Sequence, residues 1–145
     1  MLDLFKYPEN GINMKLTEYL NTFLKEKGYE YIDLGCNGET VDYPDIALPL
    51  SKAVASGECD LGILICGTGI GISIAANKIS GIRCALCHDV FSAEATRQHN
   101  DTNVIALGGR VIGPSHAIKV VDTFLSTPFS NDERHKRRIA KIEDK

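Results

Sequence analysis

The sequence of 145 residues lacks the features that mark membrane-spanning, secreted and nucleic-acid-binding proteins. It has no apolar run long enough to cross a bilayer and no signal-peptide pattern. Its formal net charge is −3, and its basic residues are scattered except for one cluster at 134–138. We therefore expect no membrane partner and no extended nucleic-acid surface.

The chain also lacks a paired cysteine pattern. Its five cysteines are odd in number, which predicts free thiols in a reducing cytoplasm rather than a disulfide framework. Cys84 and Cys87 have C-x-x-C spacing, but no second pair completes a zinc site, and their apolar surroundings favour the core. No metal and no cofactor is expected.

Repeats, low-complexity tracts and linkers are absent as well. A chain of 145 residues with 43% hydrophobic residues is long enough for one substantial core and too short for two. We expect a single domain over residues 1–145, in which 131–145 form a basic C-terminal helix or tail.

What the sequence does contain is a regular alternation of strand and helix patterns. The expected strands are residues 29–34, 61–66, 83–87 and 104–107, with 2–5 as a weak first strand, and the expected helices are 16–27, 49–57, 72–78, 92–99 and 114–125. Short β-α connections imply a parallel sheet covered on both faces. The fold class is therefore α/β, a three-layer α/β/α domain of flavodoxin or Rossmann type with about five strands.

The most informative segment is LGILICGTGIGISIAANK, residues 61–78. An apolar strand ends at Cys66, and the glycines that follow free the backbone for positive φ, so that successive N–H groups can face an anion at a helix start. In such sheets ligands bind beyond the carboxyl ends of the strands, where Cys66 and His88 would fall. Alternatively, the glycines only form a tight turn, and Cys66 is a small buried hydrophobe.

The spacing of these glycines excludes the common nucleotide sites. Position 72 is Ile, so G-x-G-x-x-G is not met, and no Gly-Lys-Ser/Thr follows. A smaller anion remains as the candidate ligand.

The basic cluster near the C-terminus has two interpretations. On a helix, Arg134 and Arg138 are four residues apart and His135 and Arg138 three, so all three can face one side. This is either a solvated helix face or a pair of arginines suited to phosphate.

Four segments together resemble one known family. CGTGIGISIAANK, GIRCAL, SAEATRQHNDTNVIALGGRVIG and RHKRR are similar to the B-type ribose-5-phosphate isomerases, within a group that includes the galactose-6-phosphate isomerase subunits. The resemblance runs from about residue 15 to 142.

The resemblance implies an aldose–ketose isomerase that acts through an enediolate. In the family the cysteine at the position of Cys66 is the base, Thr68 would support it, and the backbone of Gly67 to Gly71 would hold the enediolate oxygens. His99 would open the sugar ring, because an imidazole can give and take a proton near neutral pH. From position alone, His99 could equally serve as a helix C-terminal charge.

The remaining positions are assigned to substrate. Asn100 would orient the sugar hydroxyls, while arginines would bind the phosphate. The substrate-binding residues that the resemblance implies are Gly67, Gly69, Ile70, Gly71, Asn100, Arg110, Arg134, His135, Arg138, Tyr43 and Asn10. His88 could line the pocket, whereas His116 is expected on the surface.

The sequence departs from the family near its N-terminus. Family members carry an Asp-His pair followed by glycine, where this chain has Pro8, Glu9 and Asn10, and its first histidine is His88. An incorrect start, a change of substrate and a loss of activity are the three explanations.

The expected function is metal-free interconversion of ribose 5-phosphate and ribulose 5-phosphate. The alternatives are an isomerase of a hexose 6-phosphate such as allose or galactose 6-phosphate, a non-catalytic sugar-phosphate binding module and, least favoured, a redox protein. The expected ligand is a small sugar phosphate, and the family implies a homodimer or tetramer with a site shared between subunits.

Overall fold

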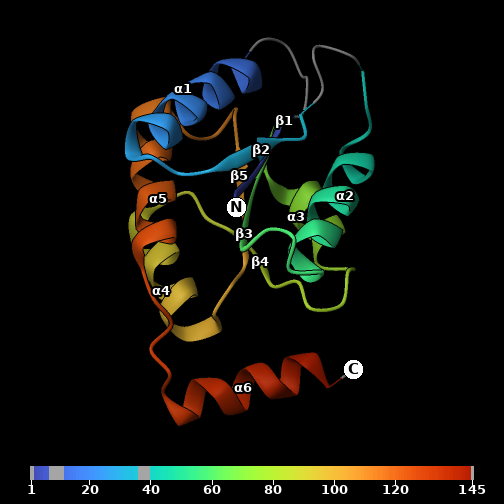
Figure 1. Ribbon diagram of the computed structural model, residues 1–145, viewed down its shortest axis with the longest axis vertical. Helices are drawn as coiled ribbons and strands as arrows, with labels where there is room; N and C mark the ends of the chain where they lie inside the picture. Colours follow the sequence, from blue (N-terminus) through green and yellow to red (C-terminus); the bar gives the residue numbers. More distant parts are fainter. Residues whose placement is uncertain (1, 7–11, 36–39, 145) are drawn as a thin grey trace.

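The computed structural model describes residues 2–6, 12–35 and 40–144, and its centre is a parallel sheet (Figure 1). In the described residues the sheet has five strands in the order β2-β1-β3-β5-β4. The strands are β1 (Leu2–Lys6), β2 (Tyr31–Asp33), β3 (Leu61–Cys66), β4 (Cys84–Leu86) and β5 (Val104–Gly108). The helices are α1 (Ile12–Lys27), α2 (Tyr43–Ala55), α3 (Ile70–Ala76), α4 (Val90–Asn100), α5 (Pro114–Ser126) and α6 (Glu133–Glu143).

Two apolar clusters cover the two faces of the sheet, which confirms the three-layer α/β/α fold. Alternate residues of β3 divide between them, because successive strand side chains point to opposite faces. Ile63 and Ile65 pack with α1 and α5, whereas Leu64 and Cys66 pack with α2 and α3. The continuous apolar run of β3 is explained by its burial on both sides.

The strand order places Cys66 at the topological switch point of the sheet. From β1 the chain moves outward to β2, and it then returns to β3 on the other side of β1. In doubly wound sheets ligands bind in the crevice beyond the carboxyl ends of the strands at this point. The order differs from that of flavodoxin, because β5 lies between β3 and β4.

The helices α1, α3 and α4 begin two to four residues earlier than the sequence pattern predicts, and α2 begins six residues earlier. The helix expected to start near Pro49 starts at Tyr43, with Pro44 in its first turn and Pro49 inside it. A proline is tolerated in the first helical turn, where backbone N–H groups have no intrahelical acceptor. Pro44, rather than Pro49, is therefore the helix-start proline, and Pro49 is exposed to solvent.

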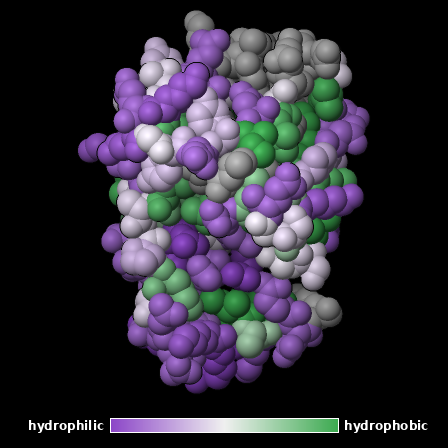
Figure 2. Space-filling model, viewed as in Figure 1, coloured by the Kyte–Doolittle hydropathy of each residue, from purple (hydrophilic) through white to green (hydrophobic). Residues whose placement is uncertain are grey.

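The helix α6 lies apart from the other layers, across the end of the sheet at which the strands begin (Figure 1). Its outer surface is mainly hydrophilic, and hydrophobic side chains are visible in the seam between it and the rest of the molecule (Figure 2). Of its eleven residues, only His135 is buried. None of the helices in the described part of the chain has the length and apolar character needed to span a membrane.

Candidate active site

Cys66 ends β3 with its side chain 5% exposed, and the loop that follows folds back over it. The backbone N–H of Gly69 donates a hydrogen bond to Cys66 Sγ at 3.1 Å. Such a donor favours sulfur that carries negative charge, as a thiolate base does. The loop therefore directs a backbone donor at the Cys66 sulfur.

Gly69 meets two requirements that exclude other residues. Its φ is 77°, the left-handed region, and a Cβ atom here would lie 2.9 Å from the backbone carbonyl carbon of Leu107. Positive φ occurs at Gly28, Gly57, Gly69 and Gly81 among the described glycines. The expectation of positive φ thus holds in this loop at Gly69, whereas Gly67 and Gly71 do not need it.

Gly71 instead provides space for Tyr43. A Cβ atom at Gly71 would lie 2.6 Å from Tyr43 Cζ and 2.9 Å from its hydroxyl oxygen, so the tyrosine ring packs directly on the first turn of α3. Tyr43 begins α2 and remains 39% exposed. The structure therefore places this substrate-binding candidate beside the cysteine loop.

The end of β5 locks the same loop from the other side. Gly109 N–H donates to the Cys66 carbonyl at 2.8 Å, and Arg110 N–H donates to the Gly67 carbonyl at 3.0 Å. A Cβ atom at Gly108 would lie 2.7 Å from the carbonyl carbon of Thr68. Thr68 Oγ1 in turn accepts a hydrogen bond from Ile70 N–H at 3.3 Å.

His88 belongs to this arrangement, although its position after a strand was the only sequence signal for it. Its Nε2 accepts the backbone N–H of Gly108 at 2.9 Å, so Nδ1 carries the proton of the neutral ring. Partial burial lowers the His88 pKa, against the opposing effect of the neighbouring Asp89 carboxylate. A neutral His88 therefore holds the end of β5 against the loop.

His99 lies elsewhere, in the last turn of α4, against α6. Its ring centroid is 4.5 Å from that of His135, with a tilt of 42° between the planes. His135 Nδ1 is 2.9 Å from Ser130 Oγ, and the His135 side chain is buried. Burial is the main cause that lowers the His135 pKa, with added effects of His99, Arg134 and Arg138.

The three basic residues of α6 do not share one environment. Arg134 and Arg138 are exposed, and Arg134 pairs with Asp132 at 3.4 Å. His135 is turned inward beneath His99. The arginines thus stay accessible to an anion, whereas the contacts of His135 suit it to support His99.

The candidate residues fall into two groups at opposite edges of the sheet. Cys66 pairs with Gly108 at the carboxyl edge, whereas the turn after α4 reaches the amino edge, where the Asn103 carbonyl accepts Gly62 N–H at 2.9 Å. Cys66 lies four residue steps along β3 from Gly62, which is about 13 Å. One copy of the chain therefore does not bring His99 and Cys66 together.

Each edge carries a different set of candidate residues. The carboxyl edge holds a thiol with a backbone donor, Thr68, Tyr43 and the start of the Arg110 loop. The amino edge holds His99, Asn100 and two accessible arginines. Asn10 lies outside the described residues.

Two arginines at the amino edge were not identified from the sequence. Arg97 donates to the Thr102 carbonyl at 2.6 Å and pairs with Asp101 at 2.9 Å. Arg83 reaches Asn100, Asp101 and Glu143. Arg83 lies in the GIRCAL motif, but its partners are distant in sequence and no spacing rule points to them.

Comparisons with known proteins give a consistent result. The pattern of the Ribose/Galactose Isomerase family matches residues 9–142. A putative sugar phosphate isomerase of Bacillus subtilis is 56% identical over 127 residues, 86% of this chain and 85% of that protein. Ribose-5-phosphate isomerase B of Escherichia coli is 51% identical over 120 residues, 82% of this chain and 80% of that protein. The structure of ribose-5-phosphate isomerase B of Clostridium thermocellum superimposes with a TM-score of 0.92 at 48% identity, over 99% of this chain and 96% of that one.

Proposed function

Since the chain belongs to the Ribose/Galactose Isomerase family, we propose that it interconverts ribose 5-phosphate and ribulose 5-phosphate, with Cys66 as the base. The observation that carries the proposal is the Cys66 thiol at the switch point of the sheet, with the Gly69 N–H 3.1 Å from its sulfur. Relatives named for this activity support the choice of a pentose phosphate over a hexose 6-phosphate.

The proposed reaction begins with ring opening. His99 accepts the anomeric hydroxyl proton and returns a proton to the ring oxygen, which gives the open-chain aldose. His135 holds the His99 ring from behind, and Asn100 orients the sugar hydroxyls. The exposed Arg134 and Arg138 bind the phosphate, which supplies binding energy remote from the reacting carbons.

Proton transfer between carbons then takes place at Cys66. The thiolate removes the proton from C2 and returns it to C1, while the hydroxyl proton of O2 moves to O1. The negative charge of the enediolate develops on the two oxygens, next to the backbone of Gly67 to Gly71. Thr68, Ile70, Tyr43 and Arg110 line the same side of the substrate.

The two halves of this site require a second copy of the chain. We place the carboxyl edge of one subunit against the amino edge of its partner, in a homodimer or a tetramer, so that Cys66 and His99 of different subunits face one substrate. An apolar surface supports this arrangement, because large hydrophobic side chains are left exposed near the carboxyl edge. They are Ile70, Ile74, Leu86, Phe91 and Val111, of which Phe91 is 79% exposed.

The proposal is tested by incubating the purified protein with ribose 5-phosphate in the presence of a chelator and following ketose formation. We expect turnover that the chelator leaves unchanged. Allose 6-phosphate and galactose 6-phosphate are the matched substrates, and a higher kcat/KM for either would replace the pentose assignment. Binding of ribose 5-phosphate without turnover would make the protein a sugar-phosphate binding module.

A further inference from the structure

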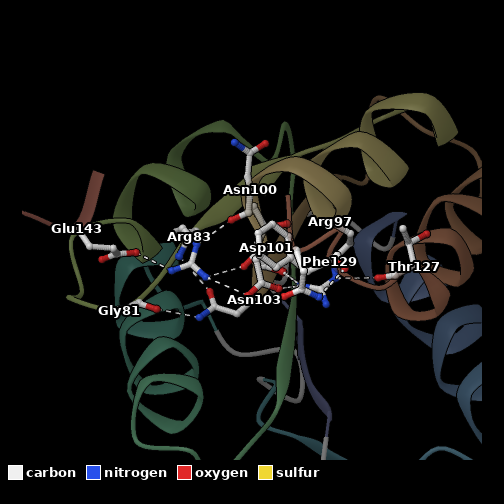
Figure 3. A network of polar contacts seen from close by, with 11 residues as sticks. Gly81, Arg83, Arg97, Asn100, Asp101, Asn103, Thr127, Phe129 and Glu143 are labelled. Atoms are coloured by element: carbon white, nitrogen blue, oxygen red, sulfur yellow. Dashed lines mark hydrogen bonds and ion pairs between the residues drawn. The ribbon is translucent and has the colours of Figure 1, made fainter. Parts of the chain in front are cut away.

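The guanidinium of Arg83 joins three segments at the amino edge of the sheet (Figure 3). Its Nε donates to the Asn100 carbonyl at 2.8 Å, and its Nη2 donates to the Asp101 carbonyl at 2.7 Å. Its Nη1 donates to Glu143 Oε1 at 2.6 Å. One side chain thus connects the end of α4, the start of β4 and the end of α6.

The turn that Arg83 binds is the one that carries His99 and Asn100. The helix α4 ends there with Asp101 at a φ of 43°, and the last carbonyls of a helix need donors from outside it. The Arg83 backbone is held by the same turn, since its N–H donates to Asn103 Oδ1 at 2.9 Å and its carbonyl accepts Asn103 N–H at 3.1 Å. The position of the Arg83 backbone is therefore fixed independently of its contact with Glu143.

The helix α6 is attached to the body near each of its ends. Near its start, His135 packs on His99 and Ser130 N–H donates to the Gln98 carbonyl at 3.2 Å. At its end, Glu143 pairs with Arg83 beside a hollow of about 510 Å³, and Ile142 is 49% exposed. Apolar packing at the end of α6 is thus incomplete. The ion pair between Glu143 and Arg83 is a contact there that depends on direction.

We propose that Arg83 and Glu143 form a clamp that positions α6 relative to His99, and so sets the distance between the phosphate arginines and the ring-opening imidazole. This inference rests on the proposed function. A helix of eleven residues is about 16 Å long. With its far end released the helix can pivot about His135, which displaces Arg138 more than Arg134 and so disturbs a geometry that must hold to within about 0.5 Å.

Glu143→Ala tests the clamp, with Glu133→Ala as the matched control. Glu133 is also on α6 and in an ion pair, with Lys136 at 3.0 Å, but that pair lies within the helix. We expect Glu143→Ala to raise both KM for ribose 5-phosphate and the inhibition constant of inorganic phosphate about fivefold, with kcat within twofold of wild type. Glu133→Ala leaves all three unchanged.

The sign of the effect separates positioning from a change in charge. Removing a carboxylate near a phosphate site strengthens phosphate binding if charge alone matters, because one repulsion is lost. The clamp predicts the opposite for Glu143→Ala, and it predicts near-complete rescue by Glu143→Gln, which keeps an oxygen acceptor for Arg83. Faster amide hydrogen exchange in α6 of Glu143→Ala, with native exchange in the sheet, confirms a local release.

Two results would contradict the proposed clamp and leave the proposed function unaffected. The first is a wild-type enzyme that turns over ribose 5-phosphate beside a Glu143→Ala variant with unchanged KM and phosphate inhibition. The second is tighter phosphate inhibition in both Glu143→Ala and Glu143→Gln. Wild-type protein without turnover contradicts the proposed function itself.

Discussion

At the scale of single residues, the proposed base Cys66 is distinguished from Cys84 and Cys87 by its surroundings. Cys66 receives the Gly69 N–H, whereas burial raises the pKa of Cys84 to about 12 and that of Cys87 to about 11. These two thiols stay protonated at neutral pH and pack on opposite faces of the sheet. The core role expected for the C-x-x-C pair is thus confirmed.

Cys66→Ala should abolish isomerisation while the fold and sugar-phosphate binding persist, because the change removes the base and leaves the loop backbone and the arginines in place. Cys66→Ser should be nearly as damaging, since an alcohol is a far poorer proton acceptor at neutral pH. Initial rates and ligand titration measure the two effects, and Cys84→Ala is the control that keeps turnover. More than a few per cent of wild-type turnover in Cys66→Ala would contradict the assignment.

His99→Asn should reduce turnover of the cyclic sugar more than turnover of an open-chain substrate analogue, because only the cyclic form needs ring opening. The ratio of kcat/KM for the two substrates is the measurement. Equal losses on both would show that His99 has a different role.

At the scale of secondary-structure elements, the sequence predicts what depends on local pattern. The strand 61–66 and the helix expected over 114–125 are confirmed, because apolar periodicity records burial directly. The helix buries Ala117, Val120, Val121 and Phe124. The inward turn of His135 and the contact of Arg83 with Glu143 could not be predicted, since each depends on how α6 docks. The direction of α4 follows from its place between the parallel strands β4 and β5, because a helix that connects them must end at the amino edge of the sheet.

Arg134→Ala and Arg138→Ala should each chiefly raise KM. The rise should correspond to a loss of about 1.5–3 kcal/mol in binding free energy, which is typical of a lost hydrogen bond to a charged group. Steady-state kinetics measure the change, with Lys136→Ala as the control, because Lys136 lies on the other side of α6 and pairs with Glu133. If both arginine variants keep the wild-type KM, residues 131–145 are a solvated helix.

Docking of α6 should weaken as the pH falls. The pKa of His135 is lowered in the fold, so its neutral form is the stable one, and His99, Arg134, Arg138 and Asp132 are the charged or titratable groups that act on it. At a pH above the pKa of His135 in the unfolded chain, about 6.5, the ring is neutral in both states and the stability of the fold does not depend on its protonation. Below that pH the imidazole binds a proton more readily in the unfolded chain than in the fold, so the contribution of His135 to stability declines.

Thermal unfolding of wild type and His135→Asn at pH 7.5 and 5.5 measures the effect. The melting temperature should fall more on acidification in the wild type than in the variant, which has no imidazole to protonate at this position. An equal fall in the two proteins would show that His135 does not contribute to the pH dependence.

At the scale of the whole molecule, the candidate residues form two groups that lie at opposite edges of one sheet. The carboxyl edge holds Cys66, the proposed base, and the amino edge holds the groups proposed to open the ring and bind the phosphate. The proposed shared site follows from this separation, because two copies can supply what one copy keeps about 13 Å or more apart.

Subunit complementation tests this claim most directly. Cys66→Ala subunits are mixed with Arg134→Ala/Arg138→Ala subunits, exchanged, and assayed at a ribose 5-phosphate concentration below the KM of the arginine variant. The shared site predicts recovery of about a quarter of the wild-type rate per subunit, since half of the dimers are mixed and each has one intact site. A mixture no more active than the sum of its separate parts, with exchange verified, would contradict it.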